Sequence, residues 1–216
     1  MDQRSDGIIL RVHPLTETSL IIRWLTPDFG RVATVAKGAR QPKSPFRGKL
    51  DLFYLADFTF RRSRRSELHA LREVSLRDTH SFLRTELKYL QQVSYCAGLI
   101  EQTTEIETPI PVLFDLLKDL LTCLGRQSPV AQTVPAFELK LLSELGLKPD
   151  LGKSRLSSGA QELVKNWVEK DWPSVLDQNV SEVLITELQK FLHGFLIYHL
   201  GKMPKGRGAA LGVEVG

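Results

Sequence analysis

Apolar and polar residues alternate with a period of two along the first third of the chain, a pattern that is typical of β-strands. Turn-forming residues separate the alternating segments, as in the stretch Thr-Pro-Asp-Phe-Gly at residues 26–30. The pattern predicts five strands, at residues 7–12, 19–25, 31–36, 50–60 and 68–76. Because these strands are short and no long helix lies between them, we expect a small closed or partly open barrel.

After residue 81 the apolar period changes to 3.6 residues, which predicts helices. Apolar stripes run through residues 83–97, 113–124, 137–145, 163–168 and 184–198. The expected fold class is therefore α+β, with a five-stranded barrel over residues 1–80 and an all-helical domain over residues 81–201. Residues 202–216 are rich in glycine, and we expect them to form a flexible tail.

Positive charge is concentrated in the predicted barrel. Residues 1–80 hold 15 Lys and Arg against 9 Asp and Glu, whereas residues 81–216 hold 14 against 16. One cationic segment contains no carboxylate and follows the third strand into a long loop; its cations are Arg31, Lys37, Arg40, Lys43, Arg47 and Lys49. A second cationic segment forms the turn before the predicted strand at residues 68–76; its cations are Arg61, Arg62, Arg64 and Arg65.

Both cationic segments connect strands of the same predicted barrel, which favours a phosphate-binding surface over an ordinary solvated loop. A small barrel with cationic loops and aromatic strands is typical of proteins that bind single-stranded nucleic acid, because rings can stack on bases. Most of the rings are needed for the core. Phe29, at a turn tip beside Gly30 and Arg31, is the candidate for stacking.

The chain lacks the usual signatures of catalysis. It has no Walker loop, no Rossmann glycine pattern and no Gly-x-Ser-x-Gly turn. Cys96 and Cys123 are too few for a disulfide framework or a four-cysteine zinc site. We therefore predict binding and no enzymatic activity; the enzymatic alternative is a metal-dependent nuclease that uses Asp51, Asp57 and Asp78.

The sequence also predicts a cytoplasmic, nucleoid-associated protein that does not enter a membrane. No run of about 18 apolar residues occurs. The first residues include Asp2, Arg4 and Asp6 rather than a charged segment followed by an apolar one, as in a secretory signal.

Several strings of residues resemble one protein family. In the first third these are the turn from Arg11 to Pro14, the string Glu-Thr-Ser-Leu at residues 17–20, the turn ending at Gly30, and above all Val-Ala-Lys-Gly-Ala-Arg at residues 35–40 with Pro-Lys-Ser at residues 42–44. Phe-Glu-Leu-Lys-Leu-Leu at residues 137–142, Leu-Gly at 145–146 and Pro-Asp-Leu at 149–151 continue the resemblance, and Tyr-His-Leu-Gly at 198–201 is a weaker match. Together they resemble the bacterial recombination mediator RecO.

This resemblance implies an N-terminal OB-fold and a helical second domain. It also implies binding of single-stranded and double-stranded DNA, annealing of strands, and cooperation with RecR in loading RecA onto DNA that is coated by the single-stranded-DNA-binding protein. An RNA-binding OB-fold protein would use the same basic loops and is the alternative from the residues alone.

Two further expectations follow from the resemblance. Many RecO proteins carry two cysteine pairs as a zinc site after the Pro-Asp-Leu segment, but residues 151–159 contain no cysteine, so we expect no structural zinc and no cofactor. The acidic, apolar tail of the single-stranded-DNA-binding protein should dock in a groove with a cation at its rim, formed by residues 111–124 and 136–145. The candidate cations are Lys118, Arg126 and Lys140.

Overall fold

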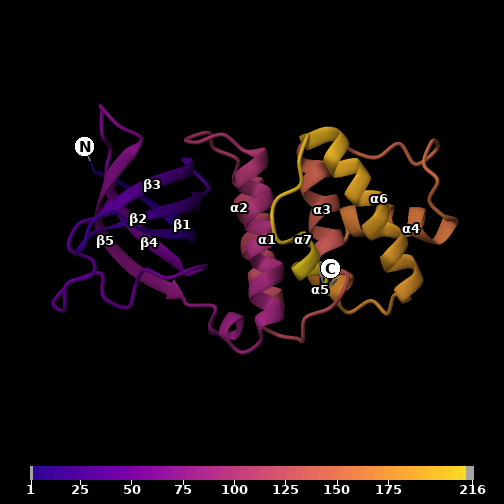
Figure 1. The fold of residues 1–216 in the computed structure, drawn as a ribbon, viewed down its shortest axis with the longest axis horizontal. Coiled ribbons are helices and arrows are strands. Elements are labelled where there is room, and N and C mark those ends of the chain that lie inside the picture. The colour runs from indigo at the N-terminus through magenta and orange to yellow at the C-terminus, as the bar shows by residue number, and fades with distance from the viewer. Residues whose placement is uncertain (1, 213–216) are drawn as a thin grey trace. The chain divides into compact units, whose positions relative to one another are not determined.

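The computed structural model describes residues 2–212, and its first part is a closed five-stranded barrel (Figure 1). The strands are β1 (Asp2–Pro14), β2 (Leu20–Thr26), β3 (Gly30–Ala36), β4 (Leu55–Arg61) and β5 (Leu68–Asp78). They follow the order β1-β2-β3-β5-β4 around the barrel, and only β3 and β5 pair in parallel. The predicted barrel and the α+β fold class are confirmed.

Two of the predicted strand boundaries are wrong. The strand β1 begins at Asp2 rather than at residue 7, because the polar residues 2–6 pair with β4 and so continue the ladder. The strand β4 begins at Leu55 rather than at residue 50. Phe53 has a φ of 63°, outside the range of a strand, and the N–H of Tyr54 donates to the carbonyl of Asp51 in a turn.

Aromatic rings fill the interior of the barrel. Trp24 and Phe58 stack with ring centroids 4.1 Å apart, and Phe60 stacks on Phe58. A Cβ at Gly7 would lie 2.7 Å from the Phe58 ring, so only glycine fits at this position of β1. The indole N–H of Trp24 donates to Thr34 Oγ1 over 2.8 Å, which satisfies its one polar group inside the core.

The two connections that flank β4 leave the barrel at opposite ends of that strand. Residues 37–54 join the end of β3 to the start of β4, whereas residues 62–67 join the end of β4 to the start of β5. The seven residues of β4 place these two points roughly 20 Å apart. The two cationic segments therefore leave the barrel at different ends.

Helices form the rest of the chain. They are a short 3-10 turn (Ser81–Arg84), α1 (Leu87–Thr103), α2 (Pro111–Leu124), α3 (Thr133–Glu144), α4 (Ser158–Glu169), α5 (Trp172–Leu176), α6 (Glu182–Leu200) and α7 (Arg207–Leu211). The helix α3 is buried along most of its length and packs on α1, α4 and α6. By its contacts the chain divides into two compact units, and residues 104–118 group with the barrel rather than with the helices.

The C-terminal residues differ from the flexible tail expected from residue 202 onward. Residues 207–211 form α7, which packs on α1. The guanidinium of Arg207 reaches Glu138 on α3 through two hydrogen bonds, of 2.7 and 2.9 Å. A buried carboxylate needs a charged partner, and Arg207 supplies it for Glu138. Residues 213–216 lie outside the described part of the chain.

Candidate nucleic-acid interface

The loop at residues 37–54 is anchored to the barrel although it contains no strand or helix. Phe46 is buried and packs into the core of the barrel. The main-chain N–H of Arg40 donates to the carbonyl of Thr18 over 3.0 Å, so the loop is tied to the connection between β1 and β2. Successive turns bond Gln41 to Gly38 and Ser44 to Gln41. The cations of this loop therefore project from a hydrogen-bonded frame.

The five cations of this loop have no carboxylate partner within residues 2–212. Lys37, Arg40, Lys43 and Arg47 are exposed, and Lys49 is half-buried. The only hydrogen bonds described for these side chains go from Arg40 and Arg47 to main-chain carbonyls, over 3.5 and 3.3 Å. Their charge is thus available to phosphate groups.

The other cations predicted for the site behave differently, because several are held by the protein itself. Arg31 is half-buried and donates to Thr104 Oγ1 over 2.8 Å. Arg61 forms an ion pair with Asp2 at 2.8 Å, and Arg62 pairs with Glu107. Arg64 and Arg65 are exposed, and residues 2–212 contain no ion pair for either. The ten predicted cations therefore fall into two groups. Arg31, Arg61 and Arg62 are bound by groups of the protein itself, and the other seven form no ion pair with the described residues.

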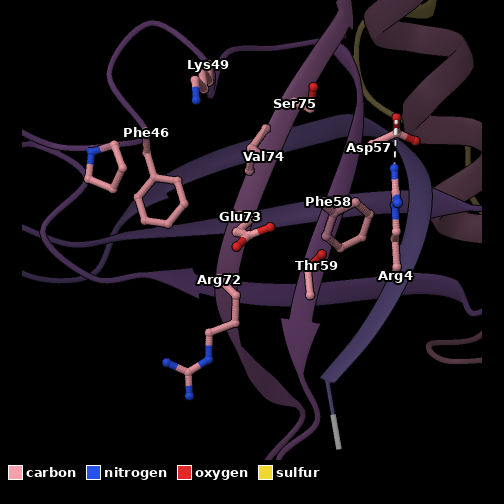
Figure 2. A pocket seen from close by; sticks show the side chains of 11 residues that line it. Arg4, Phe46, Lys49, Asp57, Phe58, Thr59, Arg72, Glu73, Val74 and Ser75 are labelled. Atoms are coloured by element: carbon pink, nitrogen blue, oxygen red, sulfur yellow. Dashed lines mark ion pairs between the residues drawn. The ribbon is translucent and has the colours of Figure 1, made fainter.

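A hollow of about 400 Å³ extends this surface from the loop onto β4 and β5 (Figure 2). Phe46 and Lys49 line it from the loop, Arg4 from β1 and Arg72 from β5. In Figure 2 Arg4 points at Asp57, 3.7 Å away, whereas Arg72 extends away from that pair. Sequence analysis missed Arg4 and Arg72, because only the pairing of β1, β4 and β5 brings them beside the loop.

The carboxylates considered for a nuclease lie in separate environments. Asp57 is bound by Arg77 through two hydrogen bonds of 2.8 Å. The hydrogen bond that Asp6 shares with Asp57 raises the pKa of Asp6 and lowers the pKa of Asp57. Asp51 and Asp78 each accept a main-chain N–H instead. Within residues 2–212 no three His, Cys, Asp or Glu side chains gather closely enough to hold a metal ion.

Phe29, the predicted stacking residue, is half-buried rather than free. Its ring meets Phe60 edge-on, with centroids 5.4 Å apart. Phe29 and Arg62 line the same cavity of about 150 Å³ at the end of the barrel. The structure thus brings together two candidate site residues that are 33 positions apart in the sequence.

The three cations proposed for a protein partner have different surroundings. Lys118 groups with the barrel unit and lies 5.8 Å from the centre of the Phe114 ring. Arg126 is exposed. Lys140 is half-buried: its ammonium donates to the carbonyls of Val168 and Lys170 at the end of α4, and burial lowers the pKa of Lys140. Part of the hydrogen-bonding capacity of Lys140 is therefore already used within the helical unit.

Cys96 is buried and Cys123 is half-buried, and both are free thiols. Burial raises the pKa of each thiol, which keeps both in the unreactive neutral form. None of the helices among the described residues combines the length and the apolar character that crossing a membrane requires.

The strand order and the basic loop define the class: a protein with an N-terminal OB-fold barrel, the fold that commonly binds oligonucleotides. The family model for the N-terminal region of recombination protein O matches residues 1–80, and the model for its C-terminal region matches residues 84–154. The chain therefore belongs to the RecO family.

Curated relatives agree with this assignment. The chain is 34% identical to the DNA repair protein RecO of Rhodopirellula baltica over 143 residues, which are 66% of this chain and 53% of that protein. It is 32% identical to that of Pelotomaculum thermopropionicum over 157 residues, 73% of this chain and 60% of the relative. It is 28% identical to the DNA repair protein RecO of Listeria monocytogenes over 151 residues, which are 70% of this chain and 58% of that protein. The matched part is thus less than two thirds of each relative.

Proposed function

We propose that this chain binds single-stranded DNA, and also duplex DNA, through the loop at residues 37–54, and that it acts as a recombination mediator in DNA repair. The observation that carries the proposal is the set of five loop cations without a carboxylate partner among the described residues. The relatives named as DNA repair proteins support the choice of DNA. Binding and annealing of strands, rather than catalysis, is the activity that this surface suits.

The chemistry of the surface favours contacts with the DNA backbone. Lysine and arginine side chains neutralise phosphates and release condensed counterions, which drives binding without regard to sequence. Arg4 and Arg72 would continue the track of positive charge from the loop across the hollow beside Lys49. Annealing benefits from such contacts, because they screen the repulsion between two strands and leave the bases exposed.

Titration of a fluorescent single-stranded oligonucleotide, followed by anisotropy, tests this proposal. The double variant Lys37→Ala/Arg40→Ala should bind about 25-fold more weakly at 0.1 M salt, since each lost phosphate contact on a single strand costs about fivefold there. The matched control is Lys165→Ala/Lys190→Ala, which removes two exposed lysines from α4 and α6. Equal losses in the two double variants would refute the assignment. Competition with RNA of the same sequence distinguishes DNA from the RNA alternative.

Membership of the RecO family also suggests partners. We propose that the chain cooperates with RecR, that it docks the acidic tail of the single-stranded-DNA-binding protein, and that it thereby helps to load RecA onto coated DNA. Arg126 is the best placed of the three candidate cations for such a tail, because it is exposed. Lys140 already donates to carbonyls at the end of α4.

A further inference from the structure

The loop at residues 37–54 carries one large apolar side chain in the middle of its cations. Apart from prolines, Phe46 is the only aromatic or aliphatic residue among residues 40–49. It is 6% exposed and packs in the same core cluster as Phe58 and Val74. In Figure 2 its ring points from the loop toward the strands of the barrel. The most cationic part of the loop is therefore pinned to the barrel by a single side chain.

The main chain around Phe46 is ordered by short-range hydrogen bonds. The N–H of Phe46 donates to Ser44 Oγ over 3.2 Å, and the carbonyl of Phe46 accepts the N–H of Lys49 over 3.0 Å. The N–H of Arg47 donates to the carbonyl of Ser44 over 3.2 Å. Gly48 lies inside the last of these turns with a φ of 73°, a conformation that favours glycine. The backbone that carries Arg47 and Lys49 thus has a defined path before any ligand is bound.

Such turns need support from the rest of the protein. A hydrogen bond that is open to water adds little net stability, so the turns of an exposed loop do not hold it in one conformation by themselves. A disordered loop would lose backbone freedom when it binds a ligand, and this loss subtracts from the affinity. Burial of the Phe46 ring supplies the missing stabilisation before binding, because it removes apolar surface from water.

We propose that Phe46 is a positioning residue for DNA: its docked ring holds the neighbouring cations in the arrangement that binds phosphates, and the ring itself does not touch DNA. The inference rests on the proposed function. A ring that is 6% exposed has almost no free face on which a base could stack. The docked ring also lines the hollow that Lys49 shares with Arg72 of β5, so docking brings a loop cation and a strand cation to one site.

A positioning residue and a phosphate-binding residue should have different signatures. Without its anchor the loop populates many arrangements, and the affinity falls by the fraction of molecules in the competent one. The number of phosphates that are neutralised stays the same, so the dependence on salt should not change. Loss of a cation, as in Lys37→Ala/Arg40→Ala, lowers both the affinity and the salt slope.

Anisotropy titrations of the full chain with a single-stranded oligonucleotide, at four salt concentrations, test the proposal. Phe46→Ala should bind about tenfold more weakly at each concentration, as expected if about a tenth of the loops remain competent, with the slope still roughly −3.5. The matched control is Leu71→Ala, which also truncates a residue of the core cluster that is 6% exposed but lies on β5, outside the loop. Its affinity should stay close to that of the wild type.

Phe46→Leu separates positioning from direct stacking. Leucine refills much of the space of the ring and keeps the loop docked, so the affinity should recover to within about threefold of the wild type. A ring that stacked on bases would be lost equally in Phe46→Leu and Phe46→Ala.

Limited digestion by trypsin measures the state of the loop without DNA. Cleavage after Lys43 and Arg47 requires the loop to open, so it should be about tenfold faster in Phe46→Ala than in the wild type or in Leu71→Ala.

A pair of variants at Gly48 applies the same test without disturbing the core. A Cβ at Gly48 meets no atom within 4 Å, so Gly48→Ala only strains the turn at its positive φ. It should weaken DNA binding with an unchanged salt slope, and Gly48→Asn should restore binding, because asparagine tolerates this conformation better. This pair keeps the test valid if Phe46→Ala does not fold.

The possible failures are distinguishable. Equal affinities of Phe46→Ala and Leu71→Ala, or a Phe46→Leu variant as weak as Phe46→Ala, would overturn the positioning role and leave the proposed function standing. A reduced salt slope in Phe46→Ala, or equal binding by the wild type and Gly48→Ala, would do the same. A wild-type chain that binds no single-stranded DNA would overturn the proposed function itself.

Discussion

The barrel unit and the helical unit use arginine in opposite ways. In the loop at residues 37–54, Arg40 and Arg47 are exposed and have no carboxylate partner within the described residues. In the helical unit, the side chain of Arg207 is only 9% exposed and binds Glu138, which is fully buried. Tyr95 donates a further hydrogen bond of 2.5 Å to the same carboxylate, and burial together with Glu138 raises the pKa of Tyr95.

The difference shows that the location of a charge decides its role. An exposed arginine adds little to the stability of the fold and can exchange water for a phosphate group. A buried arginine has lost its water, so its partner is an internal carboxylate and its removal leaves that carboxylate uncompensated. Substitutions in the loop should therefore change binding, and substitutions at the buried pair should change folding.

The largest effect should come from breaking the buried pair. Arg207→Met or Glu138→Gln should lower the free energy of unfolding by about 3–5 kcal/mol, because each leaves one polar group buried without its partner. Urea denaturation followed by circular dichroism measures this. Arg47→Met, the same kind of change in the loop, should stay within about 0.5 kcal/mol of the wild type. Similar losses in both variants would contradict the contrast between the units.

The next effect concerns salt. If about five phosphates are neutralised on a single strand, log affinity should fall against log salt with a slope of roughly −3.5, a hundredfold loss between 50 and 200 mM. Lys37→Ala/Arg40→Ala should reduce the slope to roughly −2.1, since two contacts are lost. Titrations at four salt concentrations give these slopes. A slope near zero in the wild type would mean that binding is not electrostatic.

A smaller effect should separate the arginines of the turn after β4. Arg65→Gln removes an exposed charge and should weaken binding of single-stranded DNA by up to about fivefold at 0.1 M salt. Arg61→Gln/Asp2→Asn removes both members of an ion pair and leaves the net charge unchanged. Its affinity should stay close to that of the wild type. If the paired variant loses more affinity than Arg65→Gln, Arg61 leaves its partner to bind DNA.

In the helical unit, Arg126→Glu should weaken the binding of the acidic tail peptide of the single-stranded-DNA-binding protein about threefold to tenfold, because it reverses the charge that meets the carboxylates of the peptide. Affinity for DNA alone should not change. Isothermal titration with the peptide measures the first effect and anisotropy the second. Lys118→Glu and Lys140→Glu are the companion variants, and unchanged peptide binding in all three would place the docking site elsewhere.

Chelation should have no effect on folding. Residues 151–159 lack the cysteines of a zinc site, so dialysis against EDTA should leave the melting temperature of the chain unchanged. Elemental analysis of the purified protein gives an independent reading. Stoichiometric zinc that resists dialysis would show that other ligands replace the missing cysteines.

Much of the fold could be predicted from periodicity alone. Alternation located all five strands, and the 3.6-residue stripes located the long helices, because each of these patterns comes from one face that must be buried. The polar beginning of β1 and the turn before β4 were missed. Gln3 and Ser5 face the interior against the usual pattern, and the positive φ of Phe53 has no signal in an apolar run.

Composition also identified the basic loop, because a segment with six cations and no carboxylate is visible in the sequence itself. Only the tertiary structure decided which of the cations are available. Arg62 meets Glu107 and Arg61 meets Asp2 across 45 and 59 residues, and Arg207 reaches Glu138 across 69. Such pairs depend on strand register and helix packing, which are long-range properties, whereas charge and periodicity are local ones that the sequence carries directly.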